Sequence, residues 1–375
     1  MNNFYCLSIL FLLLFESSIQ ARSQTTLDYQ SRIHPEIGSE FMVVTQNKHA
    51  TEAGYEILRQ GGNAVDAAVA VGFALSVTLP RAGNLGGGGF VLIYDQDKNE
   101  ISSIDYRSAA PESSKSEMFI QDGKVVKFGH LVNAVPGSVA GLLKAHDNHG
   151  SLPLSTLLKP AIRLAKNGFE VTYDLNFVLE WGGESMLANK ASREKFYNVK
   201  KEPIEVKKLF KQPNLAKTLF MISKNGKDSF YKGEIAKWIS EESLSNGGLI
   251  TLDDLSSYEA KTRIPIETNY RGYRVVTMPP AASGGLVLLQ TLNILENFDL
   301  KDSGPNSAES VHILSEAMQR AFADRVKFHG DPDFYDVPVK QMLNKKYSSD
   351  RAQTISDTRT PDGEIFEGDL RQYYE

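Results

Sequence analysis

The sequence predicts an α+β protein in which helices pack against an antiparallel-rich sheet. The main observation is an apolar helical segment, residues 64–80, that leads into two short strands joined by a polar turn. The second is composition: 375 residues, 41% of them hydrophobic and 23% charged, are ordinary for a soluble globular protein and can bury a substantial core. A chain of this length can form one large unit.

Two helices are predicted near the N-terminal end of this unit. Residues 50–60 have helical character, and Gly61-Gly62 can end that helix. Asn63 can cap the next helix, residues 64–80, which is apolar on nearly every side. A helix of this kind is expected to lie buried between layers.

Two strands follow, at residues 90–94 and 100–106, and four consecutive glycines, Gly86–Gly89, precede them. Glycine lets the backbone approach a ligand or another chain closely and adopts positive φ freely, so the run could be a loop of close approach. The alternative is a hinge loop. A phosphate-binding loop is disfavoured because the run precedes a strand instead of following one.

The rest of the chain is predicted to contain an amphipathic helix over 155–167 and a longer one over 306–329. Asn306 can cap the longer helix, and Glu309 can complete a capping box. Its expected core-facing side consists of Val311, Leu314, Met318, Ala321 and Phe322. The polar stretch of residues 354–375 is expected to be a mobile tail with few apolar anchors.

The N-terminus, residues 1–21, is predicted to be a secretory signal peptide. Its apolar run is too short to span a bilayer, which requires about 20 apolar residues. An uncleaved anchor is the alternative, since no Lys or Arg precedes the run. Removal after Ala21 would also remove Cys6, the chain's one cysteine, which suits an oxidising compartment. We therefore expect a periplasmic or secreted protein with no stable membrane span after signal removal.

Composition excludes several function classes. The formal net charge of -5 argues against nucleic-acid binding. A single cysteine excludes a disulfide framework, a zinc finger and a cysteine nucleophile in the body of the chain. Residues 330–336, GDPDFYD, cluster three carboxylates, but proline and aromatic residues break the spacing of a calcium loop, so a structural turn is favoured. We expect no metal and no cofactor.

Arg107 is the candidate binding residue. It follows the second strand, close in sequence to the glycine run, where a guanidinium could hold a substrate carboxylate with two parallel hydrogen bonds. A salt bridge to its neighbour Asp105 is an equally supported alternative.

Six motifs in order resemble the large subunit of the γ-glutamyltransferases (γ-glutamyltranspeptidases, glutathione hydrolases), from about residue 36 to the end. They are GGNAVDAA at 61–68, GNLGGGGF at 83–90, DYR at 105–107, VPGSVAG at 135–141, YRGY at 270–273 and PPAASGG at 279–285, and EAM at 316–318 with ADR at 323–325 continues the match.

The resemblance implies an N-terminal-nucleophile hydrolase fold, a four-layer αββα sandwich of which residues 22–375 form the large-subunit part. It further implies a precursor that cuts itself, and a new N-terminal threonine that attacks the γ-glutamyl carbonyl of glutathione. Water or an amino-acid or dipeptide acceptor then takes the glutamyl group. By this resemblance, the position that holds the glutamyl α-carboxylate is Arg107.

The sequence departs from the family pattern in two places. Ser108 and Ala109 replace charged residues commonly found after the arginine. The chain also ends at Glu375, so the threonine is expected downstream, on a small subunit from the same precursor, and no catalytic residue is expected in this chain. Two alternatives are a related self-processing amidase, of the poly-γ-glutamate or β-lactam acylase type, and a non-catalytic secreted remnant.

Overall fold

The computed structural model describes residues 37–374 and divides the chain into two units, Met1–Met42 and Val43–Glu375. Of the first unit, the described residues 37–42 form no helix or strand, whereas the second holds all the described secondary structure. The predicted signal peptide, residues 1–21, lies outside the described residues. Within the described part, no helix combines the length and apolar character needed to cross a membrane.

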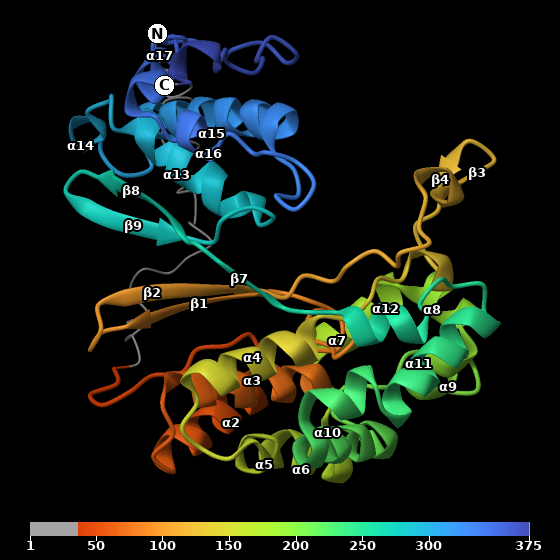
Figure 1. Cartoon of the computed structure of the whole chain (residues 1–375). Helices are drawn as coiled ribbons and strands as arrows, with labels where there is room; N and C mark the ends of the chain where they lie inside the picture. Colours follow the sequence, from red (N-terminus) through yellow and green to blue (C-terminus); the bar gives the residue numbers. More distant parts are fainter. Residues whose placement is uncertain (1–36, 375) are drawn as a thin grey trace, which may run out of the picture. The chain divides into compact units, whose positions relative to one another are not determined.

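A group of helices forms the first outer layer (Figure 1). Helix α2, Lys48–Arg59, is followed by a left-handed glycine, Gly61, with a φ of 87°. Asn63 then caps α3, Ala64–Thr78, through a capping box with Asp66. As predicted, α3 is largely buried, and it packs against α2, α4 (Ser138–His149) and α6 (Lys159–Asn167).

The other helices of this group are α5 Leu154–Leu157, α7 Tyr173–Trp181, α8 Gly183–Ala188, α9 Lys190–Phe196, α10 Pro213–Tyr231, α11 Glu234–Ser245 and α12 Leu252–Ser257. The single helix predicted over residues 155–167 is therefore two, α5 and α6, which meet at Leu158. Pro160 is the physical reason, because proline is accommodated in the first turn of a helix but not in its interior.

A three-stranded sheet covers this helical group. Strands β1, Phe90–Asp95, and β2, Glu100–Asp105, form the predicted hairpin, with Phe90 opposite Asp105, and β7, Lys261–Arg263, pairs with the far edge of β2. On one face Val91 and Ile93 pack into the main hydrophobic core. On the other face of β1, Leu92 and Tyr94 are exposed.

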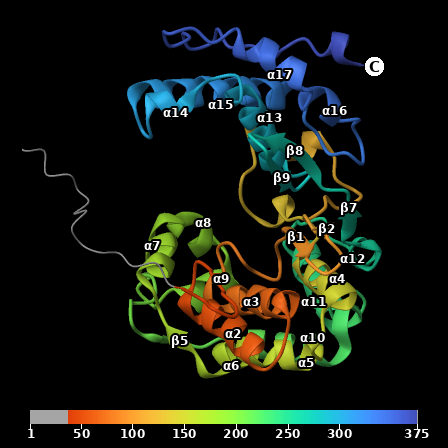
Figure 2. The ribbon, with the colours of Figure 1, turned by 90° about the vertical axis from the view of Figure 1, so that its left-hand side faces the viewer.

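A second strand and helix pair follows in sequence. The hairpin of β8, Ile266–Tyr270, and β9, Tyr273–Thr277, turns at Arg271 and Gly272, which both have positive φ. It packs on α13, Ser283–Leu295, which lies between the hairpin and the neighbouring helices (Figure 2). Those helices are α14 Leu300–Ser303, α15 Ala308–Phe328, α16 Val339–Met342 and α17 Lys345–Ala352.

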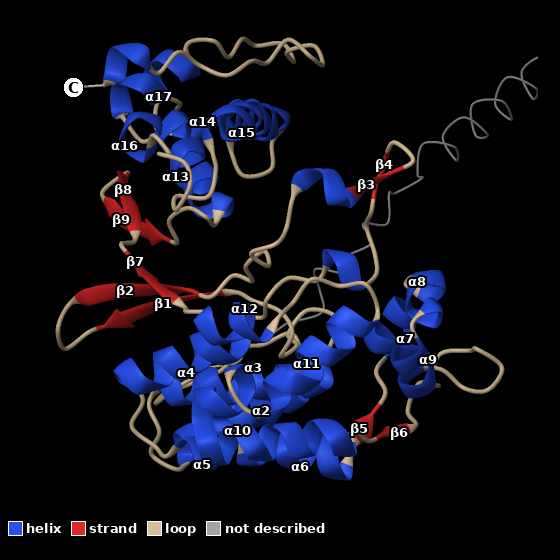
Figure 3. Ribbon diagram, turned by 45° about the vertical axis from the view of Figure 1, so that its right-hand side comes forward, coloured by secondary structure: helices blue, strands red, loops and turns tan. Residues whose placement is uncertain are grey.

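The order of layers is thus helices, sheet, sheet, helices, as Figure 3 shows by colour. Minor elements complete the chain: the pairs β3 Ile120–Gln121 with β4 Lys124–Val125 and β5 Phe169–Glu170 with β6 Leu209–Phe210, and 3₁₀ turns at Ser116–Phe119, His130–Val132 and Arg371–Tyr373. The predicted α+β class and αββα architecture are confirmed.

The long helix α15 corrects two expectations. Ser307 caps it instead of Asn306, which has a φ of 58°, and no capping box with Glu309 forms. Of the five residues expected to face the core, Ala321 alone is buried, and Val311, Leu314, Met318 and Phe322 are exposed. The buried face instead consists of Ile313, Glu316, Ala317, Arg320, Ala321 and Asp324.

The C-terminal stretch was expected to be a mobile tail, and the structure contradicts that. Leu370 and Tyr373 are buried in a cluster with Leu286 and Tyr347. Backbone bonds add to this anchoring: Gly368 N donates to Asp324 at 2.8 Å, and a guanidinium nitrogen of Arg351 donates to the carbonyl of residue 366 at 2.9 Å. Thr354 and Thr360 also bind buried charges on α15, the side chains of Arg320 and Glu316, a pairing that local sequence does not reveal.

Candidate functional site

The end of strand β2 fixes the backbone of Arg107 and leaves its side chain exposed. The Arg107 amide donates to Asp105 Oδ1 at 3.0 Å, and the Arg107 carbonyl accepts from the Tyr258 hydroxyl at 2.8 Å. Within the described part of the chain, the guanidinium makes no hydrogen bond or ion pair. The guanidinium is therefore attached to a backbone that hydrogen bonds hold in place, and all its N–H donors are available to a ligand.

Asp105 is not the ion-pair partner of Arg107. Its Oδ2 instead accepts from Nε of Arg263, on β7, at 3.2 Å. The other end of the Arg263 guanidinium binds Asp333 through two contacts of 2.8 Å. The acidic neighbour is thus already neutralised by a second arginine, and the salt-bridge alternative for Arg107 is wrong in this structure.

The loop 330–336 is a structural turn tied to the same strand. Asp331 closes it by accepting from the amides of Phe334 and Tyr335 at 3.0 and 2.9 Å. Asp333 accepts from Arg263 and, at 2.5 Å, from Lys261, and these cations hold the pKa of its carboxyl well below the usual range. Among residues 37–374, no three His, Cys, Asp or Glu side chains gather as a metal site.

The glycine run brings backbone segments together. A Cβ on Gly88 would lie 2.5 Å from Ser108 N and 2.7 Å from Tyr106 O, and one on Gly89 would lie 2.9 Å from the Tyr106 ring. Gly87 O accepts from Gly137 N at 2.8 Å. None of the four glycines has positive φ, and close approach to another part of the chain explains Gly88 and Gly89.

Three tyrosines, Tyr106, Tyr231 and Tyr258, contact the backbone segments that meet at the glycine run. Tyr231 stacks on Tyr258 with ring centroids 5.6 Å apart, and its hydroxyl donates to Pro136 O at 2.8 Å. Burial raises the pKa of all three phenols, Tyr106, Tyr231 and Tyr258, so they remain neutral hydrogen-bonding groups. The motifs at 83–90, 105–107 and 135–141 therefore form one rigid assembly around the base of Arg107.

His329 lies within electrostatic reach of Arg107. Burial is the main cause of its lowered pKa, and the nearby cations Arg325 and Arg107 lower it further. Its Nε2 is buried and has no hydrogen-bond partner among residues 37–374. The lowered pKa favours the neutral imidazole at pH 7, so His329 adds no second positive charge beside the guanidinium.

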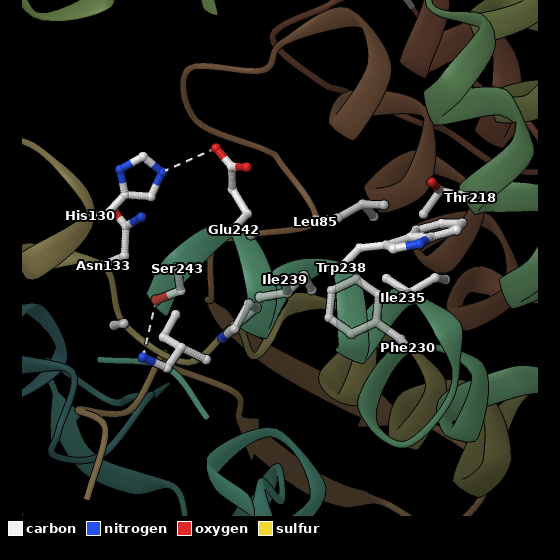
Figure 4. Close-up of a pocket in the computed structure, with 14 residues that line it drawn as sticks. Leu85, His130, Asn133, Thr218, Phe230, Ile235, Trp238, Ile239, Glu242 and Ser243 are labelled. Carbon is white, nitrogen blue, oxygen red and sulfur yellow. Dashed lines mark hydrogen bonds and ion pairs between the residues drawn. The ribbon is translucent and has the colours of Figure 1, made fainter. Parts of the chain in front are cut away.

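A separate cavity of about 590 Å³ opens between α10, α11 and the 130–136 segment (Figure 4). Trp238, Phe230 and Thr218 line one side, and His130 and Glu242, which pair at 3.5 Å, line the other. Arg107 is not among the lining residues. No local sequence pattern predicts this cavity, because its walls come from segments up to 165 residues apart, Leu85 to Ile250.

Two motif residues on α15, Glu316 and Asp324, have structural roles. Glu316 and Arg320 form a buried ion pair at 2.6 Å on α15. Burial opposes ionisation of Glu316, but hydrogen bonds from Thr360 and Arg320 outweigh it and lower its pKa to about 2. Asp324 accepts from Tyr347 at 2.7 Å. These residues orient α15 and hold the C-terminal stretch.

The layered architecture and the motif assembly at the strand end define an N-terminal-nucleophile hydrolase fold. Among solved structures, the γ-glutamyltranspeptidase of Helicobacter pylori matches with a TM-score of 0.87 and 39% identity, covering 91% of this chain and 99% of that one. A family model described as gamma-glutamyltranspeptidase matches residues 50–374. The chain belongs to the γ-glutamyltranspeptidase family, and the resemblance seen in the sequence is confirmed.

Two curated relatives show the range of the family. The glutathione hydrolase proenzyme of Escherichia coli (strain K12) is 44% identical over 346 residues, which are 91% of this chain and 60% of that protein. The acylase ACY 1 proenzyme of Pseudomonas sp. (strain SE83) is 36% identical over 88% of this chain and 61% of that protein. The chain thus spans less than two thirds of these relatives.

Proposed function

We propose that this chain is the large subunit of a self-processing γ-glutamyltransferase, or glutathione hydrolase. The enzyme cleaves γ-glutamyl amide bonds, as in glutathione, and passes the glutamyl group to water or to an amino-acid or dipeptide acceptor. The observation that carries this proposal is Arg107: a fixed, exposed guanidinium without an ion-pair partner in the described part of the chain. A free α-carboxylate is the complementary ligand.

The division of labour follows from what the chain contains. Arg107 binds the α-carboxylate and so positions the γ-carbonyl, while the nucleophilic threonine belongs to the small subunit of the same precursor. The α-amino group of that threonine, with a pKa of about 8, can act as its general base. No metal or cofactor takes part in this scheme.

The lengths of the relatives support a processed precursor. The chain covers 60% of the Escherichia coli proenzyme, yet 99% of the Helicobacter pylori chain in the solved structure. A proenzyme that separates into two chains accounts for both values. We further propose that the signal peptide of residues 1–21 directs the precursor to the periplasm or outside the cell.

The acylase relatives raise a second substrate class, β-lactam side chains. Arg107 favours a γ-glutamyl substrate, because a β-lactam side chain without an α-carboxylate would leave the guanidinium unpaired. Poly-γ-glutamate shares the γ-glutamyl unit, and a direct comparison of glutathione with a poly-γ-glutamate oligomer distinguishes them.

The test is expression of the full-length precursor beside residues 1–375 alone. The precursor should cut itself and hydrolyse a γ-glutamyl anilide, whereas residues 1–375 should show no turnover. The shorter chain should also bind a hydrophobic dye through exposed apolar residues such as Leu92 and Tyr94. Clear turnover by purified residues 1–375 would place the nucleophile inside this chain and refute the proposal.

A further inference from the structure

Helix α7 carries three exposed aromatic side chains along one face. Tyr173, Phe177 and Trp181, called the α7 aromatic row below, are 76%, 65% and 82% exposed. Successive members are four residues apart, which aligns the rings along the helix. We propose that this row, together with a lysine-bearing turn beside it, binds the surface of an anionic membrane. This property goes beyond the proposed enzyme activity and does not depend on it.

The α7 aromatic row is separate from the side of α7 that joins the hydrophobic core. The core-facing side consists of Leu175 and Leu179, which are both buried. Each leucine is two residues from an aromatic member, which places it about 200° away around the helix axis. The leucines therefore attach α7 to the protein, and the three rings remain as apolar surface that an outside partner can cover.

A further exposed apolar side chain lies on the turn between α9 and β6. Val199 is fully exposed there and is followed by Lys200 and Lys201, which are exposed as well. Asn198 Oδ1 fixes the turn by accepting from the amides of Lys200 and Glu202 at 2.9 and 3.0 Å. In this arrangement the valine can enter the headgroup layer of a bilayer while the ammonium groups stay beside the phosphates.

Hydrogen bonds hold this turn against α7. The Tyr197 hydroxyl donates to Leu179 O at 2.6 Å, and Asn176 Nδ2 donates to Ile204 O at 3.0 Å. These bonds attach both sides of the turn to the helix, and Asn176 directly precedes the central member of the aromatic row. Figure 3 shows the loop between α9 and β6 extending outward at this end of the helical group.

The charge of the turn region is opposite to that of the chain as a whole. Residues 198–211 hold five lysines and two glutamates, whereas the formal net charge of the chain is -5. Lys208 pairs with Glu205 at 2.7 Å, which leaves four lysines against Glu202. A local excess of lysine attracts the region to anionic lipid headgroups.

Carboxylates on α7 and α8 reduce this attraction without reversing it. Arg81 neutralises Asp174 through two contacts of 3.0 and 2.9 Å. Glu180 and Glu184 remain, and α9 adds three basic residues and one glutamate. Over residues 173–211, eight basic residues exceed six acidic ones.

The combination of exposed rings and lysines favours a lipid surface over a protein partner. Tyrosine and tryptophan are enriched where a membrane meets water, because each ring has an apolar body and a polar tip. Lysine is depleted in protein–protein interfaces, whereas its long apolar stem and terminal charge suit the headgroup layer. We therefore identify the partner as the anionic headgroup layer of a bilayer.

Vesicle co-sedimentation of the full-length enzyme tests the proposal. At about 0.1 M salt the enzyme should sediment with vesicles of phosphatidylglycerol and phosphatidylcholine, and at least about tenfold less with phosphatidylcholine alone. The variant Tyr173→Ser/Phe177→Ser/Trp181→Ser should bind the anionic vesicles at least about tenfold more weakly. The control Phe220→Ser, at an exposed phenylalanine on α10, should bind as the wild type does.

The lysines are tested by a second variant. Lys200→Gln with Lys201→Gln leaves the backbone bonds to Asn198 in place and should weaken binding by up to about 30-fold. Hydrolysis of a γ-glutamyl anilide and the thermal midpoint should equal those of the wild type in both variants, since the replaced side chains are exposed. Equal binding of wild type and the lysine variant would refute recognition of anionic lipid.

An environment-sensitive dye distinguishes lipid from protein at the same surface. Phe177→Cys and, as the matched control, Phe220→Cys are labelled with a nitrobenzoxadiazole dye in an enzyme whose other cysteines, including Cys6, are serine. Anionic vesicles should raise the emission at position 177 at least about twofold and leave position 220 unchanged.

Three results would overturn the proposal. The first is a wild-type enzyme that does not sediment with anionic vesicles, and the second is an aromatic-row variant that binds them as well as the wild type. The third is bright, blue-shifted emission at position 177 before vesicles are added, because it would show that another part of the protein or a second copy already covers the row.

Discussion

Arg107→Lys in the full enzyme should reduce substrate capture far more than stability. Lysine keeps the charge but replaces two parallel donors by one flexible ammonium. Loss of a bidentate pair to a carboxylate in a partly desolvated pocket should cost about 2–4 kcal/mol, a reduction of roughly 30- to 1000-fold in kcat/KM. Stability should be nearly unchanged, because the residue's structural bonds are made by its backbone, to Asp105 and Tyr258.

The assay compares kcat/KM for a γ-glutamyl anilide, the thermal midpoint and the extent of self-cleavage in three proteins: wild type, Arg107→Lys and Arg81→Lys. Arg81 is the matched control, because it forms a two-contact ion pair with Asp174 through its side chain. Self-cleavage should survive in both variants, since it acts on the chain's own peptide bond and needs no free carboxylate. A processed, folded Arg107→Lys enzyme with near-normal kcat/KM would remove Arg107 from the site.

Two further predictions concern stability. Gly88→Ala should lower stability by about 1–3 kcal/mol, because its Cβ would meet backbone atoms 2.5 and 2.7 Å away, while Gly183→Ala, which meets nothing within 4 Å, should change it little. Equal thermal midpoints for the two variants would contradict the close-approach explanation. Glu316→Gln should destabilise the protein at pH 7 by up to about 3 kcal/mol, since the folded pKa is about 2 against an ordinary 4.5. That stability is present above pH 4.5 and is lost as pH falls toward 2, so urea unfolding should show the difference narrowing over this interval, and a constant difference would refute the assignment.

The local sequence pattern was sufficient to predict the buried helix α3 and the hairpin of β1 and β2. Asn63 capped the buried helix as predicted, and the hairpin of β1 and β2 formed with the turn in the predicted place. Both depend on residues close together in sequence, where capping and alternation are decisive. The break between α5 and α6 also had a local cause, Pro160, which the helical pattern of the surrounding residues obscured.

The candidate site was predictable only in part. Arg107 could be picked out from its place after a strand and from the family motif. Its surroundings could not, because Tyr258 lies 151 residues away and Arg263 lies 158 residues from Asp105. Proximity in sequence suggested that Asp105 pairs with Arg107. In the structure Asp105 pairs instead with Arg263, from the distant strand β7.

The error at α15 has a more general physical cause. Interpreting an apolar helix face as core-facing assumes that the polar face finds no partners inside the protein. Here the apolar face of α15 is exposed, while Glu316, Arg320 and Asp324 are buried because the C-terminal stretch and α17 satisfy them. The same arrangement helps to anchor residues 354–374, because Thr354, Thr360 and the Gly368 amide bind buried charged side chains on α15. The apolar content of the stretch does not measure these bonds. A helix can therefore bury its ion pairs and expose its aliphatic side chains when distant segments complete the hydrogen bonds of the buried charges.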